Sequence, residues 1–167
     1  QLARQGFADA HVGALEFAQG GSVGRPHFAR YLVEQGAVAN FQQAFKRYLA
    51  AGKPAYVRTE WADLEQVCGW IIAAGGIAVL AHPLKYKMTH TKLRSLLLVF
   101  KAAGGGAVEV VSGAQQPEQT RRMAALARQF DLLASVGSDF HQLGQPWAAL
   151  GQVAALPEGC KPIWSRW

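Results

Sequence analysis

Three times after residue 60, a helical pattern gives way to a short apolar run, with glycines between the two in the first two cases. The helical stretches are residues 63–74, 91–103 and 117–130. The apolar runs that follow them are residues 77–81, 107–111 and 132–136. Cycles of roughly 27 residues have the length of an αβ repeat, whereas antiparallel hairpins need much shorter connections. The pattern therefore predicts an α/β fold with parallel strands.

The first 57 residues carry helical patterns without a strand-like run. Phe28, Tyr31 and Leu32 share one face of a short helix, and Pro26 suits its first turn. A second amphipathic helix is predicted at residues 41–49, where apolar side chains recur at the same spacing. We expect a helical segment over residues 1–57 and an αβ part over residues 58–167.

Composition narrows the choice of partner and compartment. Of the 167 residues, 50% are hydrophobic and 17% are charged, which favours a folded chain, and the net charge of +6 favours an anionic partner. Cys68 and Cys160 are far apart and predict neither a disulfide framework nor a zinc–thiolate site. No apolar run is long enough to span a membrane. We expect a cytoplasmic protein without membrane association and, because the sequence starts at Gln1 rather than Met, a piece of a longer chain.

Side chains with useful chemistry follow each of the three predicted strands. His82 comes directly after the first apolar run, Ser112 directly after the second, and Asp139 and His141 shortly after the third. In parallel α/β folds the carboxyl ends of the strands face the ligand site. The sequence therefore predicts that these side chains lie close together.

Asp139 and His141 offer an oxygen ligand and a nitrogen ligand two positions apart. In an extended backbone, alternate residues point the same way, so both can reach one metal ion. His82 precedes Pro83, which also favours an extended backbone and sets where the imidazole begins. A surface or packing role is the alternative for each residue, but their placement after separate strands favours a common site.

Glu109 lies inside an apolar strand, where an unpaired carboxylate is costly, so it must have a partner. A salt bridge or a helix amino end is one interpretation, and an active-site role is the other. Ser112 with Gly113 forms either a simple turn or a contact for a phosphate oxygen.

Further residues near these positions predict a phosphate-binding surface. Lys85 and Tyr86 follow the first apolar run, and Arg25 and His27 open a predicted helix, whose amino end favours anions. The alternatives are solvated loop charges for the lysine and helix capping for Arg25 and His27. The tryptophans do not alternate with basic residues and are interpreted as packing residues; they are Trp61, Trp70, Trp147, Trp164 and Trp167.

Four segments of the chain, in order, resemble the PHP (polymerase and histidinol phosphatase) superfamily. They are residues 24–30 (Gly-Arg-Pro-His-Phe-Ala-Arg), 52–57 (Gly-Lys-Pro-Ala-Tyr-Val), 81–83 (Ala-His-Pro) and 137–141 (Gly-Ser-Asp-Phe-His). The resemblance is closest to the branch that removes phosphate from nucleoside 3',5'-bisphosphates and trims RNA from its 5' end. It implies the carboxyl-terminal part of a distorted β/α, TIM-like barrel, with residues 1–57 in a helical insertion. The family's amino-terminal His-x-His pair and several further ligands are absent from this sequence.

Carried over by position, the resemblance implies that His82, Asp139 and His141 are metal ligands. The family binds two or three divalent metal ions, with Mn²⁺ foremost and Fe²⁺ or Zn²⁺ as alternatives. The resemblance also implies substrate or phosphate contacts at Arg25, His27, Lys85, Tyr86 and Ser112. The attacking group would be a metal-bound water rather than a side chain.

The resulting hypothesis is a metal-dependent phosphoesterase acting on nucleotides or RNA 5' ends, without a stable protein partner. One alternative is a histidinol-phosphatase-like or amidohydrolase-like hydrolase on the same metals, which a substrate panel distinguishes. Another is a non-catalytic RNA-binding or regulatory module, which the metal content distinguishes.

Overall fold

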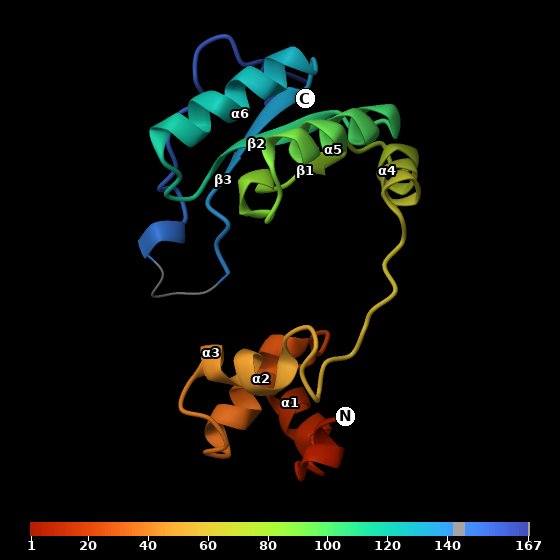
Figure 1. Cartoon of the computed structure of the whole chain (residues 1–167), viewed down its shortest axis with the longest axis vertical. Coiled ribbons are helices and arrows are strands. Elements are labelled where there is room, and N and C mark those ends of the chain that lie inside the picture. The colour runs from red at the N-terminus through yellow and green to blue at the C-terminus, as the bar shows by residue number, and fades with distance from the viewer. Residues whose placement is uncertain (142–145, 167) are drawn as a thin grey trace. The chain divides into compact units, whose positions relative to one another are not determined.

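The computed structural model of the protein describes residues 1–141 and 146–166 and divides into two compact units, Gln1–Trp61 and Ala62–Trp167 (Figure 1). Each unit has its own cluster of buried hydrophobic side chains. Residues 56–63 have no regular secondary structure, and they contain both this division and the change of character that the sequence predicts after residue 57.

The first unit is helical, as the sequence predicts. Its elements are the 3₁₀ turn η1 (Leu2–Gln5), the helices α1 (Ala10–Ala18), α2 (Arg25–Glu34) and α3 (Phe41–Ala44), and the π turn η2 (Phe45–Leu49). Helix α2 buries Tyr31 and Leu32, and α1 packs against it. Gly13 of α1 lies against the Tyr31 ring, where a β-carbon would overlap the aromatic atoms. A glycine is needed there because the two helices approach closely.

The second unit contains the predicted αβ cycles. Its elements are α4 (Leu64–Ala73), β1 (Val79–Leu80), η3 (Pro83–Lys85), α5 (His90–Ala102), β2 (Ala107–Ser112), α6 (Pro117–Gln129), β3 (Leu133–Gly137), η4 (Pro146–Ala148) and η5 (Ile163–Arg166). The helices match the predicted stretches to within a residue or two at each end, because their apolar periodicity is local information.

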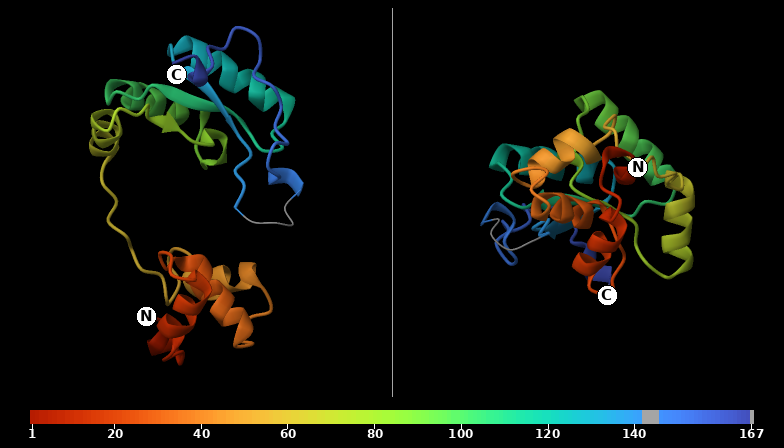
Figure 2. Two further views of the ribbon diagram at one scale, coloured as in Figure 1. Left: turned by 180° about the vertical axis from the view of Figure 1, so that it is seen from behind. Right: turned by 90° about the horizontal axis from the view of Figure 1, so that it is seen from below.

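The three strands form one parallel sheet in the order β1-β2-β3, which confirms the predicted α/β fold with a parallel sheet. All six residues of β2 are buried, as expected for a central parallel strand. The pairing with β3 is irregular between Glu109 and Val111, which marks a β-bulge. Seen from behind, the carboxyl-terminal stretch returns beside β3, where Ala134 forms a parallel bridge with Pro162 (Figure 2).

Helices α4, α5 and α6 all contribute buried side chains to the core of the second unit. Leu97 and Phe100 of α5 and Met123 of α6 are among the most completely buried, together with Val108 and Val110 of β2. This core holds the three strands in register, and their carboxyl ends consequently open at one edge. In the part of the chain that the structure describes, no helix has the length and apolarity needed to cross a membrane.

The two cysteines differ in their environments, and we expect them to differ in reactivity. Cys68 of α4 is buried, and burial raises the pKa of its thiol. Cys160 is partly exposed. Iodoacetamide should therefore label Cys160 first in the native protein and label Cys68 only after unfolding, as measured by peptide mass spectrometry. Equal labelling of both thiols under native conditions would contradict the packing of α4 on the sheet.

Candidate active site

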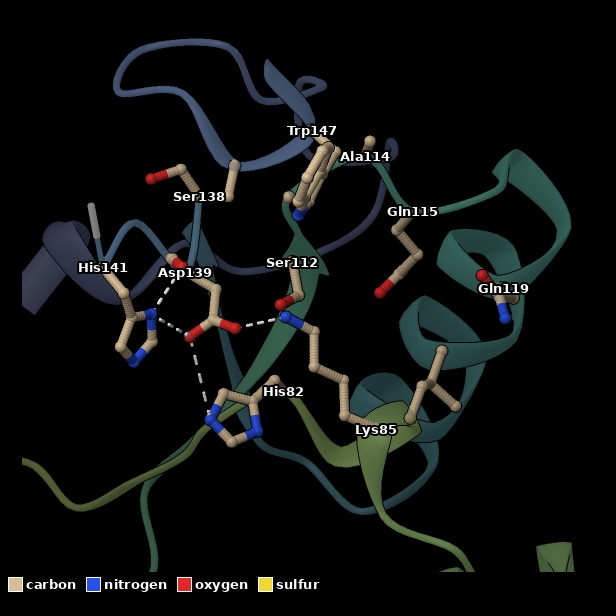
Figure 3. Close-up of a pocket in the computed structure, with 13 residues that line it drawn as sticks. His82, Lys85, Ser112, Ala114, Gln115, Gln119, Ser138, Asp139, His141 and Trp147 are labelled. Carbon is tan, nitrogen blue, oxygen red and sulfur yellow. Dashed lines mark hydrogen bonds and ion pairs between the residues drawn. The ribbon is translucent and has the colours of Figure 1, made fainter. Parts of the chain in front are cut away.

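A pocket of about 390 Å³ lies at the carboxyl ends of the three strands (Figure 3). His82 follows β1, Ser112 ends β2 and Asp139 follows β3. The side chains around the pocket are those of His82, Leu84, Lys85, Ser112, Ala114, Gln115, Gln119, Ser138, Asp139, His141, Trp147 and Ala148. Five of the residues that the sequence singled out therefore meet in one pocket: His82, Lys85, Ser112, Asp139 and His141.

Asp139 is the centre of this group of side chains. One carboxylate oxygen accepts a hydrogen bond from the ammonium of Lys85. The other lies 3.7 Å from Nδ1 of His141 and 4.0 Å from Nε2 of His82. The hydrogen bond from Lys85 lowers the pKa of the Asp139 carboxyl from its ordinary value of 3.8, against the opposing effect of partial burial. Asp139 is consequently ionised at neutral pH and available to a cation.

The backbone at two of these residues differs from the extended conformation that the sequence predicted. His82 has a φ of 33° and Asp139 a φ of 55°, both in the left-handed region. Two contacts accompany these turns: the His82 amide donates to Glu109, and Nδ1 of His141 lies 2.8 Å from the Asp139 carbonyl oxygen. Non-glycine residues rarely adopt this conformation, and such residues are concentrated at functional sites.

His82 is held by its backbone and by a neighbouring ring. Its amide donates to Oε2 of Glu109 at 2.5 Å, and the ring of Tyr86 packs edge-on against its imidazole, with 5.9 Å between centroids. The Tyr86 hydroxyl donates to the carbonyl of Ala81, so Tyr86 supports His82 and does not line the pocket. Burial and the negative charge of Glu109 both raise the pKa of the Tyr86 phenol.

Two buried polar atoms beside the pocket lack a partner within residues 1–141 and 146–166. These atoms are Nδ1 of His82 and Oγ of Ser112. Buried polar atoms are normally hydrogen-bonded, so these two are exceptions, and both belong to residues that line the pocket. The predicted contact of Ser112 with a phosphate oxygen stays a prediction.

Sequence reasoning missed several residues that line the pocket. Gln115 and Gln119 come from the loop and helix after β2, and Trp147 from η4. No local pattern distinguishes these residues, because their loops are brought to the site only by the fold. Trp147 is 60% exposed, and Trp61 and Trp70 are 84% and 64% exposed, so the interpretation of these three as packing residues is wrong. Trp167 lies outside the described residues.

Arg25 and His27 belong to the first unit, which is described by itself. Arg25 is the exposed first residue of α2, and it lines a second cavity of about 440 Å³ within that unit. Nδ1 of His27 accepts a hydrogen bond from the amide of Gly24 at 2.9 Å, so His27 caps the amino end of the helix. Their role on substrate phosphate stays a prediction.

The donor atoms around Asp139 suit a divalent cation, although no three His, Cys, Asp or Glu side chains in the described ranges are gathered closely enough to enclose one. One carboxylate oxygen of Asp139 has two imidazole nitrogens near it, Nδ1 of His141 at 3.7 Å and Nε2 of His82 at 4.0 Å. Nε2 is the nitrogen of His82 that faces Asp139, and the other ring nitrogen, Nδ1, is buried without a partner among the described residues. The ammonium of Lys85 already places positive charge on Asp139. Imidazole and carboxylate donors bind Mn²⁺, Fe²⁺ and Zn²⁺.

A parallel sheet whose strand ends carry such a pocket defines an α/β protein of the class that binds its ligand at the carboxyl edge of the sheet. Comparison with known proteins then gives its relatives. The chain is 45% identical over 99% of its length to a 5'-3' exoribonuclease of Haemophilus influenzae and 46% identical over 100% of its length to the 5'-3' exoribonuclease Rnm of Escherichia coli. It is 43% identical over 98% of its length to a 3',5'-nucleoside bisphosphate phosphatase of Chromobacterium violaceum.

These relatives confirm the predicted resemblance to the branch that acts on nucleoside bisphosphates and RNA 5' ends. The chain spans 60%, 57% and 58% of the lengths of the Haemophilus, Escherichia and Chromobacterium proteins, respectively. No family model matches the sequence.

Two solved structures share the mixed α/β fold. An amidohydrolase from Chromobacterium violaceum, solved with bound sulfate and no metal, superposes with a TM-score of 0.84 at 42% identity. The match covers 99% of this chain and 57% of the amidohydrolase chain. A Bifidobacterium adolescentis protein proposed to be a metal-dependent phosphoesterase has a TM-score of 0.67 at 27% identity, covering 92% of this chain and 53% of its own.

Proposed function

We propose that this chain is the substrate- and metal-binding part of a phosphoesterase that hydrolyses nucleoside 3',5'-bisphosphates and removes nucleotides from RNA 5' ends. The observation that carries the proposal is the convergence of His82, from the end of β1, with Asp139 and His141, from the end of β3, and with Lys85 beside them. The names of the homologues support the same substrates. The sulfate in the solved Chromobacterium structure supports anion binding, because sulfate has the shape and charge of phosphate.

In this proposal His82, Asp139 and His141 hold divalent metal ions, with Mn²⁺ as the first candidate and Fe²⁺ or Zn²⁺ as alternatives. A bound metal would polarise a phosphate oxygen and lower the pKa of a coordinated water. The relative proposed to be a metal-dependent phosphoesterase supports a metal requirement. Two or three ions are expected in the intact protein, with the further ligands outside this sequence.

The chain's own residues bind and orient the phosphate. Lys85 places its ammonium at the pocket and neutralises phosphate charge, and the Ser112 hydroxyl donates to a phosphate oxygen. Tyr86 keeps the His82 ring in place. Arg25 and His27 are further proposed phosphate contacts.

We also propose that β1, β2 and β3 belong to a distorted β/α barrel, with residues 1–57 as a helical insertion. The strand order β1-β2-β3 supports this, since barrel strands follow one another in sequence order. The bridge of Ala134 to Pro162 extends the pairing beyond β3 in the same parallel direction. A cytoplasmic location agrees with two free cysteines.

The function is tested by phosphate release from the intact protein. With Mn²⁺, a nucleoside 3',5'-bisphosphate should yield inorganic phosphate, EDTA should stop the release, and added Mn²⁺ should restore it. Histidinol phosphate should be a poor substrate in the same assay. No metal after gentle purification and no release from any phosphate ester would favour a binding module and overturn the proposal.

His141→Ala should lower this release by roughly 10–100-fold, because it removes one ligand near Asp139. His90→Ala is the matched control: this exposed histidine opens α5, outside the residues that line the pocket, and its loss should leave the rate unchanged. Equal rates for wild type and His141→Ala would remove His141 from the site.

A further inference from the structure

Glu109 is a buried carboxylate to which the proposed function assigns no part. It lies in the middle of β2, and only 9% of the residue is exposed. Within the residues that the structure describes, no lysine, arginine or histidine forms a salt bridge with it. The interpretation of Glu109 as half of a salt bridge is therefore wrong, whereas the alternative of a helix amino end agrees with its partner, the backbone amide of His82, which caps the 3₁₀ turn η3.

The two carboxylate oxygens of Glu109 contact the ends of both neighbouring strands. Oε2 accepts the amide hydrogen of His82, just after β1, at 2.5 Å. Oε1 occupies the space beside Gly137, the last residue of β3, where a β-carbon would overlap it. Gly137 lies two positions before Asp139. One side chain thus touches the backbone next to two proposed metal ligands.

The residue that donates to Glu109, His82, has an unfavourable backbone conformation. His82 adopts a left-handed conformation, which is costly for a side chain larger than glycine and persists only when neighbouring contacts enforce it. A charge-assisted hydrogen bond from its amide to Glu109 is such a contact. Nδ1 of His82 has no partner among the described residues, so the imidazole takes its direction from its backbone, from the Tyr86 ring and from the Asp139 carboxylate 4.0 Å from Nε2.

We propose that Glu109 is a positioning residue that holds the end of β1 and the end of β3 together, so that His82 and Asp139 face one pocket. It acts through the His82 amide and through its contact with Gly137, not as a metal ligand. The predicted effect of Glu109 on Mn²⁺ affinity rests on the proposed function. Its predicted effect on the backbone at His82 does not.

Four variants of the intact protein separate this role from others. Glu109→Leu removes the acceptor, whereas Glu109→Gln retains an acceptor oxygen at the same position. Gly137→Ala leaves Glu109 intact but pushes its carboxylate aside with a methyl group. Glu118→Leu is the control, because it makes the same chemical change at an exposed position of α6.

Two measurements are made on each variant. Hydrogen exchange by NMR reports the His82 amide without metal, and calorimetry with Mn²⁺ alone reports metal affinity. In Glu109→Leu and Gly137→Ala, exchange at His82 should be at least about tenfold faster, and Mn²⁺ affinity should fall roughly 10–100-fold. Glu109→Gln should stay within about fivefold of wild type in both, because it keeps the hydrogen bond. Glu118→Leu should match wild type.

A double mutant distinguishes the loss of this specific contact from a general destabilisation of the fold. In a Glu109→Ala background, Gly137→Ala should produce no further loss of Mn²⁺ affinity, because the carboxylate that it displaces is already gone. Additive losses would overturn the proposal. So would unchanged His82 exchange in Glu109→Leu, or a Glu109→Gln variant as defective in Mn²⁺ binding as Glu109→Leu, which would make Glu109 a ligand. If wild type binds no Mn²⁺, the proposed function fails, while His82 exchange still tests the positioning role.

Discussion

Asp139→Asn is expected to lower the rate of phosphate release by roughly 10²–10³-fold, the range found when one preorganised electrostatic group is removed from an active site. Asp139 supplies the negative charge that Lys85, His82 and His141 surround. Asparagine keeps the size of the side chain and tolerates the left-handed backbone, so the variant removes charge with little strain. The rate is measured with Mn²⁺ and a nucleoside 3',5'-bisphosphate.

Asp131→Asn is a close control for this variant. Asp131 also has a left-handed backbone, with a φ of 47°, and also lies near two lysines, Lys101 and Lys161. Its side chain is 80% exposed, against 21% for Asp139, and it lies outside the pocket at the strand ends. Asp131→Asn should leave the rate unchanged, since exposed ion pairs contribute little. A similar loss of rate in both variants would show that the effect is not specific to the site.

Phe100→Ala is expected to lower the free energy of unfolding by about 3–5 kcal/mol. Phe100 of α5 is 2% exposed and belongs to the core under the sheet. The backbone at Gly105 lies against its ring so closely that a β-carbon there would overlap it. Because α5 and the following turn are both fixed by other contacts, the cavity left by the ring cannot close fully.

Leu98→Ala is the comparison for the core variant, since Leu98 lies on the same helix but is 59% exposed. Leu98→Ala should change the free energy of unfolding by no more than about 0.5 kcal/mol. Both values come from urea unfolding followed by circular dichroism, with the slope of the transition checked for equality. A cost below about 1 kcal/mol for Phe100→Ala would mean that α5 does not pack on the sheet as described.

Much of the second unit could be predicted from the sequence, because helix periodicity and glycine breaks act over a few residues. Helices α5 and α6 and strands β2 and β3 lie where the pattern predicts them. Strand β1 is reduced to Val79–Leu80, although the apolar run covers residues 77–81. A strand extends only as far as a partner offers hydrogen bonds, and the pairing with β2 involves only two residues of β1.

The site was predicted less completely than the fold. The residue types at the strand ends, His82, Ser112 and Asp139, follow from the order of the sequence. The left-handed turn at His82 does not, because Glu109, which accepts its amide hydrogen, lies in the next strand. The rule that a residue before proline is extended describes an average preference, and here a tertiary hydrogen bond outweighs it.

The sequence by itself determined the parallel αβ cycles and the reactive side chains that follow each strand, because both depend on residues that are neighbours in the chain. Only the tertiary structure decided that Lys85 pairs with Asp139, 54 positions away, that Glu109 meets the His82 amide, and that Trp147 lines the pocket. Hydrogen bonds and ion pairs depend on distance and direction. Those quantities exist only once packing of the core has brought distant strand ends together.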